Sequence, residues 1–207
     1  MKRALGAIIV AVALLGACAS GPEPVPAPDD TYETAKTLRA QIQEFDLAQY
    51  AQSEFDSGES QFAAAELAYN TEEYATAGEG FNLAIDSYTR VIRAGFRAIA
   101  GARQDEAEAQ RALADEVKAS VAVADAYADA LDVYNQAIAE AEAGNDQEAA
   151  VLFENAAGLF AQVFADASTK RQQALEAMGR VDERIQGLDV QRETLEREAQ
   201  DDEGDDQ

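Results

Sequence analysis

Proline is confined to one short segment of this 207-residue chain. All four prolines lie within residues 19–30, and none occurs from Thr31 to the C-terminus. Because proline inside a helix removes a hydrogen bond and clashes with the preceding turn, its absence leaves the rest of the chain free to be helical. Alanine, glutamate, glutamine and arginine, which are good helix formers, dominate that part. We therefore predict one all-α domain over residues 31–199, stabilised by packing, since no cysteine follows Cys18.

The predicted domain contains two units offset by 72 residues. Positions that are bulky or small in the first unit have the same character in the second. The pairs are Phe55 and Tyr127, Phe62 and Tyr134, Ala65 and Ala137, Ala77 and Ala149, Phe81 and Phe153, Ala84 and Ala156, Tyr88 and Phe160, and Ile92 and Phe164. The spacing of alanine, aromatic residue and alanine places all three on one helical face. Each unit should therefore bury that face against a neighbouring helix.

Composition and turn signals predict helices at residues 31–44, 46–69, 72–118, 120–143 and 146–199. Asp46 and Ser120 are the expected N-caps, because short polar side chains can accept hydrogen bonds from free N–H groups. Gly144 and Asn145 are expected to form the turn between the last two helices.

Residues 49–92 and 121–164 resemble tetratricopeptide repeats, in which a turn is followed by the same spacing of alanine, aromatic residue and alanine. This resemblance implies antiparallel, TPR-like helical hairpins that bind other proteins through a concave groove. Tyrosine suits such a groove because its phenol tolerates one wet end. The candidates to line it are Tyr50, Tyr69, Tyr74, Tyr88, Tyr127 and Tyr134.

The N-terminal residues have the form of a bacterial signal peptide. Lys2 and Arg3 precede a short apolar run over residues 4–15, and small residues follow it. One alternative is a transmembrane helix, but the run is shorter than the about 20 residues that a bilayer requires. The other is a secretory signal followed by an unrelated free thiol.

The sequence that closes this run, Leu15-Gly16-Ala17-Cys18, resembles the lipobox of bacterial lipoproteins. The resemblance implies that residues 1–17 form a lipoprotein signal peptide that is removed, and that Cys18 carries acyl chains such as palmitate. Because Ala19 rather than aspartate follows the cysteine, it also implies sorting to the outer membrane. We therefore expect the protein to be lipid-anchored there, on the periplasmic face.

Residues 18–30 contain the expected lipidated cysteine and a proline-rich tether. The alternating prolines of this segment favour polyproline II, which rises about 3.1 Å per residue. Such a tether could hold the domain up to roughly 35 Å from the membrane.

The chain is strongly acidic, with a formal net charge of -24 that becomes -26 once Lys2 and Arg3 are removed with the leader. This charge argues against binding to nucleic acid or to anionic lipid headgroups. The acidic residues are spread over the predicted helices, except in a tail of residues 200–207 that we expect to be disordered. A solvated surface explains this distribution, and a basic partner or weak divalent-cation binding is the alternative.

The side chain used most often in acid–base catalysis is missing from the chain. It contains no histidine, and its only cysteine, Cys18, is expected to be blocked by lipid. There is no glycine-rich phosphate loop or nucleophile elbow. The adjacent carboxylates Glu72 and Glu73 are explained by the start of a helix. We therefore expect no enzyme, no cofactor and no metal site.

The last predicted helix carries a coiled-coil-like apolar seam. Its residues follow an alternating spacing of three and four, interrupted by Arg192. They are Met178, Val181, Ile185, Leu188 and Leu195. Residues in the same register elsewhere in the chain are Ile92, Phe96, Ile99, Leu113 and Val117. We predict that these two sets pack together within one chain, and a homodimer is the alternative.

Together these features predict a membrane-anchored periplasmic lipoprotein that binds envelope proteins through helical repeats. TPR-like bacterial lipoproteins can also be ligand-binding accessories of solute transporters, which is a second hypothesis. A third hypothesis is a structural spacer in the envelope.

Overall fold

The computed structural model describes residues 25–204, with side chains through residue 197. Our predictions for the signal peptide, Cys18 and residues 18–24 of the tether lie outside this range. The domain is all-α, as predicted, and no strand occurs within residues 25–204. Its elements are α1 (Asp29–Glu44), the 3-10 helix η1 (Leu47–Tyr50), α2 (Gln52–Asn70), α3 (Tyr74–Glu116), α4 (Ala119–Ala122), α5 (Ala124–Ala143) and α6 (Asp146–Gly204).

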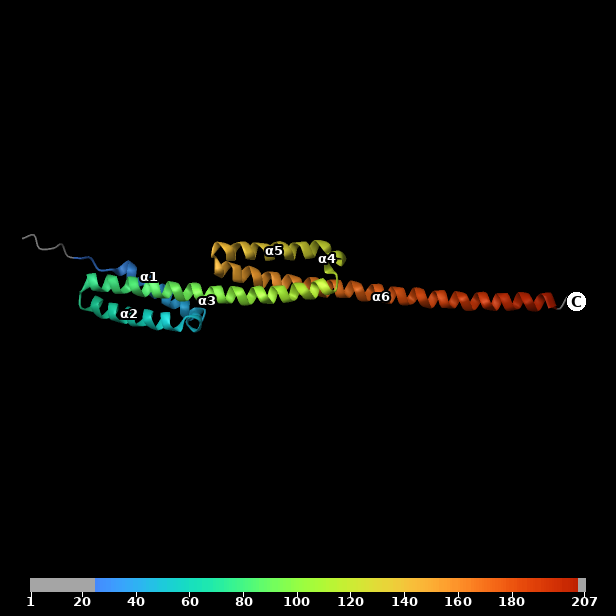
Figure 1. Ribbon diagram of the computed structural model, residues 1–207, viewed down its shortest axis with the longest axis horizontal. Coiled ribbons are helices and arrows are strands. Elements are labelled where there is room, and N and C mark those ends of the chain that lie inside the picture. Colours follow the sequence, from blue (N-terminus) through green and yellow to red (C-terminus); the bar gives the residue numbers. More distant parts are fainter. Residues whose placement is uncertain (1–24, 205–207) are drawn as a thin grey trace, which may run out of the picture.

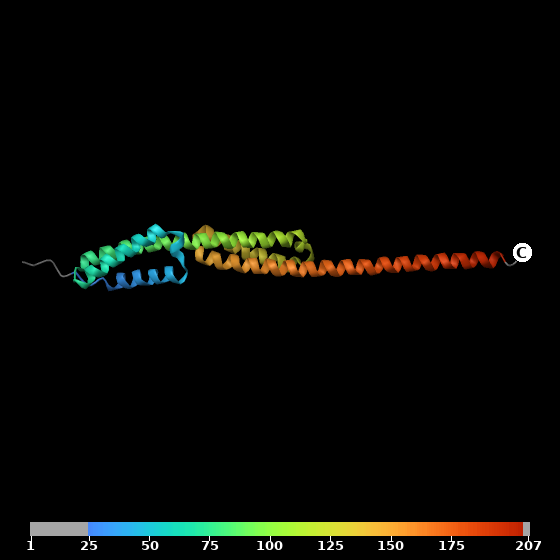
Figure 2. The same ribbon diagram turned by 90° about the horizontal axis from the view of Figure 1, so that it is seen from below.

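The helices form two three-helix units that share α3 (Figures 1 and 2). The first unit contains α1, α2 and the N-terminal half of α3. The second contains the C-terminal half of α3, together with α5 and the N-terminal half of α6. Aromatic side chains lie in both cores. They include Phe81 and Tyr88 in the first unit and Phe153 and Phe160 in the second. Residues paired by the sequence repeat thus occupy equivalent places in two packed units.

The turns within the two hairpins are built in the same way. At the end of α5, Gly144 adopts a left-handed conformation with φ 82°, and the Asn145 N–H donates to the Glu140 carbonyl at 2.9 Å. At the end of α2, Glu72 is left-handed with φ 60°, and the Glu73 N–H makes the equivalent bond at 2.9 Å. This capping satisfies helix carbonyls that would otherwise lack a partner. The predicted turn at Gly144 and Asn145 is therefore confirmed.

The predicted N-caps at Asp46 and Ser120 are wrong. Asp46 is left-handed with φ 52° and makes no side-chain capping bond, and α2 begins only after η1. Ser120 lies inside the single turn α4, which follows the left-handed Lys118 with φ 57°. At both places the chain must turn within a few residues from one long helix into the next. A left-handed residue followed by one tight turn changes the chain direction in this way. A helix that started directly at Asp46 or Ser120 would not include this turn.

Gly95 lets η1 approach α3 closely in the first unit. A Cβ atom at this position would lie 2.8 Å from Leu47 Cδ2 and 2.9 Å from Leu47 Cβ. In the second unit the equivalent positions are Ala167 and Ala119, both fully buried. The pair of leucine and glycine in the first unit thus corresponds to a pair of alanines in the second.

The predicted pairing of the apolar seam within one chain is wrong. The seam lies on the part of α6 that continues past the end of α3, and every residue from 171 to 197 is exposed. The reason is the length of α5, because its 20 residues return the chain only to the middle of α3, where the 59-residue α6 begins. α6 then runs beside the C-terminal half of α3 and extends beyond its end. We call residues 171–197 the α6 extension.

α6 is longer at its C-terminal end than predicted. The helix runs to Gly204, which includes part of the predicted disordered tail, residues 200–207. At the other end, α1 begins at Asp29, two residues before the predicted start of the domain at Thr31.

Candidate functional site

Tyrosine hydroxyls connect neighbouring helices throughout the domain. Each of five tyrosines donates a hydrogen bond to a carboxylate on another helix. The pairs are Tyr32 with Glu66, Tyr69 with Asp29, Tyr88 with Glu59, Tyr127 with Asp115 and Tyr134 with Glu108. A buried phenol needs such a partner, since an unpaired polar group inside a core is costly. These tyrosines therefore serve the packing of the units.

The six tyrosines suggested as groove-lining residues do not share a groove. Tyr88 is completely buried in the first core and Tyr134 is buried in the second. Neither ring is available to a partner, because both lie between helices and contact other aromatic side chains.

The other four candidates lie at three separate places in the domain. Tyr69 and Tyr74 pack against each other at the α2–α3 turn, with 5.8 Å between ring centroids. Tyr127 is half-buried in the second unit, and Tyr50 is exposed at the end of η1. The spacing that suggested a groove thus reflects the two cores and the helix ends.

The best-defined charged cluster joins α1, α2 and α3 around Glu59. Arg39 donates to both Glu59 carboxylate oxygens, at 2.7 and 2.6 Å, and the Tyr88 hydroxyl donates to one of them at 2.7 Å. Desolvation by burial acts to raise the Glu59 pKa, but the bonds from Arg39 and Tyr88 outweigh it, so that the pKa lies below its ordinary value of 4.5. Burial and the bond to Glu59 raise the pKa of Tyr88 far above its ordinary value. The cluster is thus an ion pair with a neutral phenol, which stabilises the unit without offering a reactive group.

An arginine lies over an aromatic ring at the same place in both units. The Arg39 guanidinium is 5.3 Å from the centre of the Phe62 ring, and that of Arg111 is 5.9 Å from the centre of the Tyr134 ring. These distances are within the range of cation–π attraction. Arg39 and Arg111 are 72 residues apart, so the repeat extends to α1 and the C-terminal half of α3. The pairs predicted from the sequence did not include these two arginines.

The Glu59 cluster predicts a stability that depends on acid pH. A carboxyl group whose pKa is lowered by folding stabilises the fold above its unfolded pKa, and this contribution is lost as the pH falls through the folded pKa. Glu59→Gln should lower the free energy of unfolding by roughly 1–2 kcal/mol at pH 7. The difference from the wild type should shrink as the pH falls below 4.5, as measured by urea unfolding at pH 7 and at several acidic pH values. Asp132→Asn, at an exposed position of α5, is the control and should have little effect at any of these pH values.

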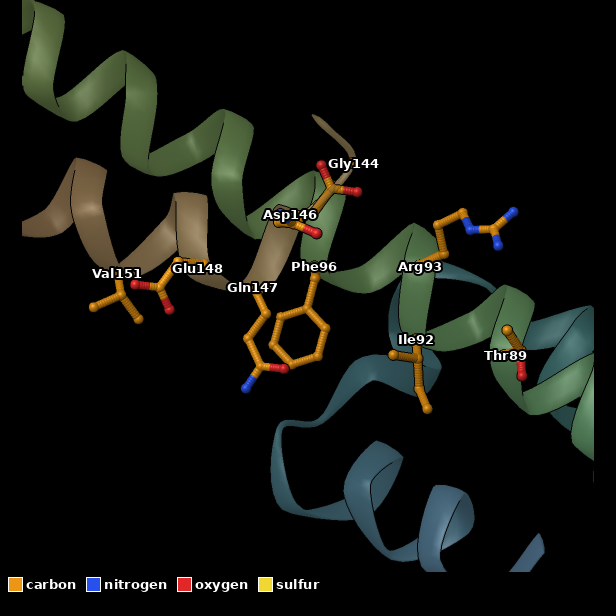
Figure 3. Close-up of a pocket in the computed structure, with 10 residues that line it drawn as sticks. Thr89, Ile92, Arg93, Phe96, Gly144, Asp146, Gln147, Glu148 and Val151 are labelled. Atoms are coloured by element: carbon orange, nitrogen blue, oxygen red, sulfur yellow. The ribbon is translucent and has the colours of Figure 1, made fainter. Parts of the chain in front are cut away.

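An open hollow lies where the two units meet. It has a volume of about 510 Å³ and lies between the middle of α3 and the start of α6. Ile92 and Phe96 of α3 and Gln147 of α6 point to the same side of the ribbon, while Arg93 points away (Figure 3). Asp146, at the edge of the hollow, is 3.7 Å from Arg97. This hollow could not be predicted from the sequence, because its residues come from distant segments.

The α6 extension carries an exposed apolar seam. We define the α6 seam as Met178, Val181, Ile185, Leu188 and Leu195, which are 52% to 64% exposed. Single exposed apolar side chains are normal, but a regular row of large ones on a projecting helix marks an interaction surface. The residues were predicted correctly as a seam, and no other part of the chain within residues 25–204 covers them.

These features define an all-α protein built as a rod of two three-helix units, with one helix that continues alone (Figures 1 and 2). No family model matches the chain, and neither a curated protein nor a solved structure does. Within residues 25–204, no helix has an apolar stretch long enough to cross a membrane. The same residues contain no group of three or more potential ligands placed to hold a metal ion.

Proposed function

We propose that this protein is a lipid-anchored envelope protein that acts as a helical scaffold for protein–protein interaction. The observation that carries the proposal is the α6 seam, whose side chains are more than half exposed on a helix that projects from the folded units. Helices with such an apolar face are a common means of recognition between proteins. The TPR-like spacing of the hairpins points to the same class of function.

The anchor is proposed from the sequence Leu15-Gly16-Ala17-Cys18 and the proline-rich tether that follows it. One acyl chain gives only marginal membrane binding, whereas several give stable anchoring. We place the anchor in the outer membrane and the helical domain in the periplasm, because Ala19 follows the cysteine.

Replacing the proposed lipidation site should release the protein from the membrane. In cells of a bacterium with two membranes, Cys18→Ser should abolish incorporation of labelled palmitate. It should also move nearly all of the protein out of the outer-membrane fraction after alkaline washing. A Ser20→Ala change, two residues away in the tether, is the matched control and should leave both properties unchanged. Membrane retention of Cys18→Ser without acylation would contradict the lipid anchor.

The scaffold function is tested by capturing partners of the anchored protein. In-cell crosslinking followed by mass spectrometry should recover a specific envelope protein with the wild-type chain. Replacing Ile185 and Leu188 by serine should reduce that recovery, because both side chains belong to the exposed seam. Capture that is equal for both chains would contradict the role of the seam.

A ligand-binding accessory of a solute transporter is the second candidate function, favoured by the hollow between the units. Its volume of about 510 Å³ is within the range of small-molecule sites, and Ile92, Phe96 and Val151 give it an apolar part. Mass spectrometry of compounds released on denaturing the purified protein would test it. Release of a stoichiometric compound that Phe96→Ala abolishes would support this candidate over the scaffold.

A structural spacer is the third candidate, and the elongated shape favours it. The 43 residues of α3 extend about 64 Å and the 59 residues of α6 about 88 Å, at 1.5 Å per residue. A spacer would tolerate polar substitutions in the α6 seam without functional loss, whereas a scaffold would not.

A further inference from the structure

The exposed half of α6 continues the register of its buried half. A strict alternation of three and four residues runs from Ala150 to Leu195. Its first part includes Phe153, Phe160 and Ala167, which are buried against the rest of the second unit. The remainder includes the α6 seam and two arginines of the same register, Arg171 before the seam and Arg192 between Leu188 and Leu195. The seam is therefore the same helical face that already packs against other helices, extended beyond the end of α3.

The residue types of the seam favour a two-stranded coiled coil. Counting the alternation as heptads places Met178 and Ile185 at a positions, and Val181, Leu188 and Leu195 at d positions. A β-branched residue at a combined with leucine at d is typical of parallel dimers. Ile185 with Leu188 has this combination in the middle of the seam.

The charges beside the seam are complementary between two parallel copies. In a parallel pair, the residue at g on one helix faces the e residue of the next heptad on the other. Arg184 at g would then face Asp189 at e of the second copy, once on each side. An antiparallel pair would instead bring the e positions together, and these are Asp182, Asp189 and Glu196, all acidic. The seam therefore matches a second copy of itself in the parallel direction.

The segment that would pair carries little net charge, so repulsion within it does not oppose the pairing. The segment 171–199 contains five arginines and seven carboxylates, a net charge of -2, whereas the whole chain carries -24. Arg192, at an a position, lies 3.8 Å from Asp189 and 3.7 Å from Glu196 of its own helix, which offset its charge. A charged residue at one a position weakens a coiled coil but fixes its register.

We propose that the α6 extension binds a second copy of this chain as a parallel two-stranded coiled coil centred on Ile185 and Leu188. The inference deepens the proposed scaffold function, on which it rests, by naming the partner of the seam. In a parallel pair, the first units of both copies lie at the same end, opposite the free end of α6 (Figure 1). Two proteins tethered to one membrane can adopt this arrangement.

The proposal is tested by thiol crosslinking of the full chain in cells. Leu188→Cys introduces a thiol at a d position, and Val190→Cys introduces one at an f position on the opposite face of the helix. Leu188 and Val190 are 59% and 62% exposed, so the two sites are matched in accessibility. The wild-type chain, whose only thiol is Cys18, gives the background. A short bis-maleimide should crosslink Leu188→Cys into dimers several-fold more efficiently than Val190→Cys.

The orientation is tested by charge exchange in the Leu188→Cys chain. Arg184→Glu and Asp189→Arg should each lower the crosslinked fraction several-fold, because two attractive pairs become repulsive. The combination of both changes should restore it. If Asp189→Arg alone increased the crosslinked fraction, the acidic e positions would have to face each other, and the parallel arrangement would be overturned.

The remaining outcomes separate this inference from the proposed function. Equal or absent dimer formation at the two thiol sites would overturn the coiled coil. Crosslinking of Leu188→Cys to a different protein would also overturn self-association, yet it would support the scaffold function. Release of the wild-type chain from the membrane would contradict the anchored scaffold without changing the comparison of the two thiol sites.

Discussion

Phe81→Ala should lower the free energy of unfolding by about 3–5 kcal/mol. The Phe81 side chain is completely buried in the first unit, where it joins α3 to the two helices that pack on it. Its ring centre lies 4.9 Å from that of Tyr32, 5.6 Å from that of Phe62 and 6.3 Å from that of Tyr69. Removing the ring leaves a cavity among neighbouring aromatic side chains that cannot close without moving α1 or α2. Urea unfolding followed by circular dichroism measures the loss.

The matched control for this change is Leu83→Ala. Leu83 lies two residues further along α3 and is 53% exposed, so its truncation removes few contacts. The expected change in the free energy of unfolding is about 0.5 kcal/mol or less. Similar losses for both variants would show that Phe81 is not a core residue of the first unit.

Gly95→Ala should lower the free energy of unfolding by about 1–3 kcal/mol, although alanine is the better helix former. The added methyl group would lie within 2.9 Å of Leu47, which is itself completely buried and cannot move into solvent. Leu47→Ala should cost about 2–5 kcal/mol, because it leaves a cavity. The double variant should cost less than the sum of both, since the new methyl group enters the space that the leucine side chain leaves.

The second unit already contains the combination made by this double variant. Ala167 and Ala119 occupy the equivalent positions and are fully buried. Gly101→Ala is the control for helix propensity, because a Cβ atom there would meet no atom within 4 Å. It should raise the free energy of unfolding by about 0.5–1 kcal/mol. Additive effects of Leu47→Ala and Gly95→Ala would contradict the close contact between η1 and α3.

The all-α class, the turn at Gly144 and the repeat could all be predicted from the amino-acid sequence alone. These features depend on local properties, such as the absence of proline, the spacing of apolar residues and the conformational freedom of glycine. Phe81 and Phe153 could be recognised as equivalent core residues because each lies about one helical turn from two alanines on the same helical face. The α6 seam was recognised in the same way, since its spacing belongs to a single helix.

Which surfaces are covered depends on the packing of helices that are distant in the sequence. Aromatic spacing is the same for a core residue and a groove residue, so Tyr88 and Tyr134 became distinguishable only when their neighbouring helices were in place. The partner of the α6 seam depends on where α5 returns the chain beside α3, which is a relation between distant segments. The sequence contains the seam and its charges, but its exposure follows from the packing of whole helices, because burial depends on neighbours that local periodicity does not specify.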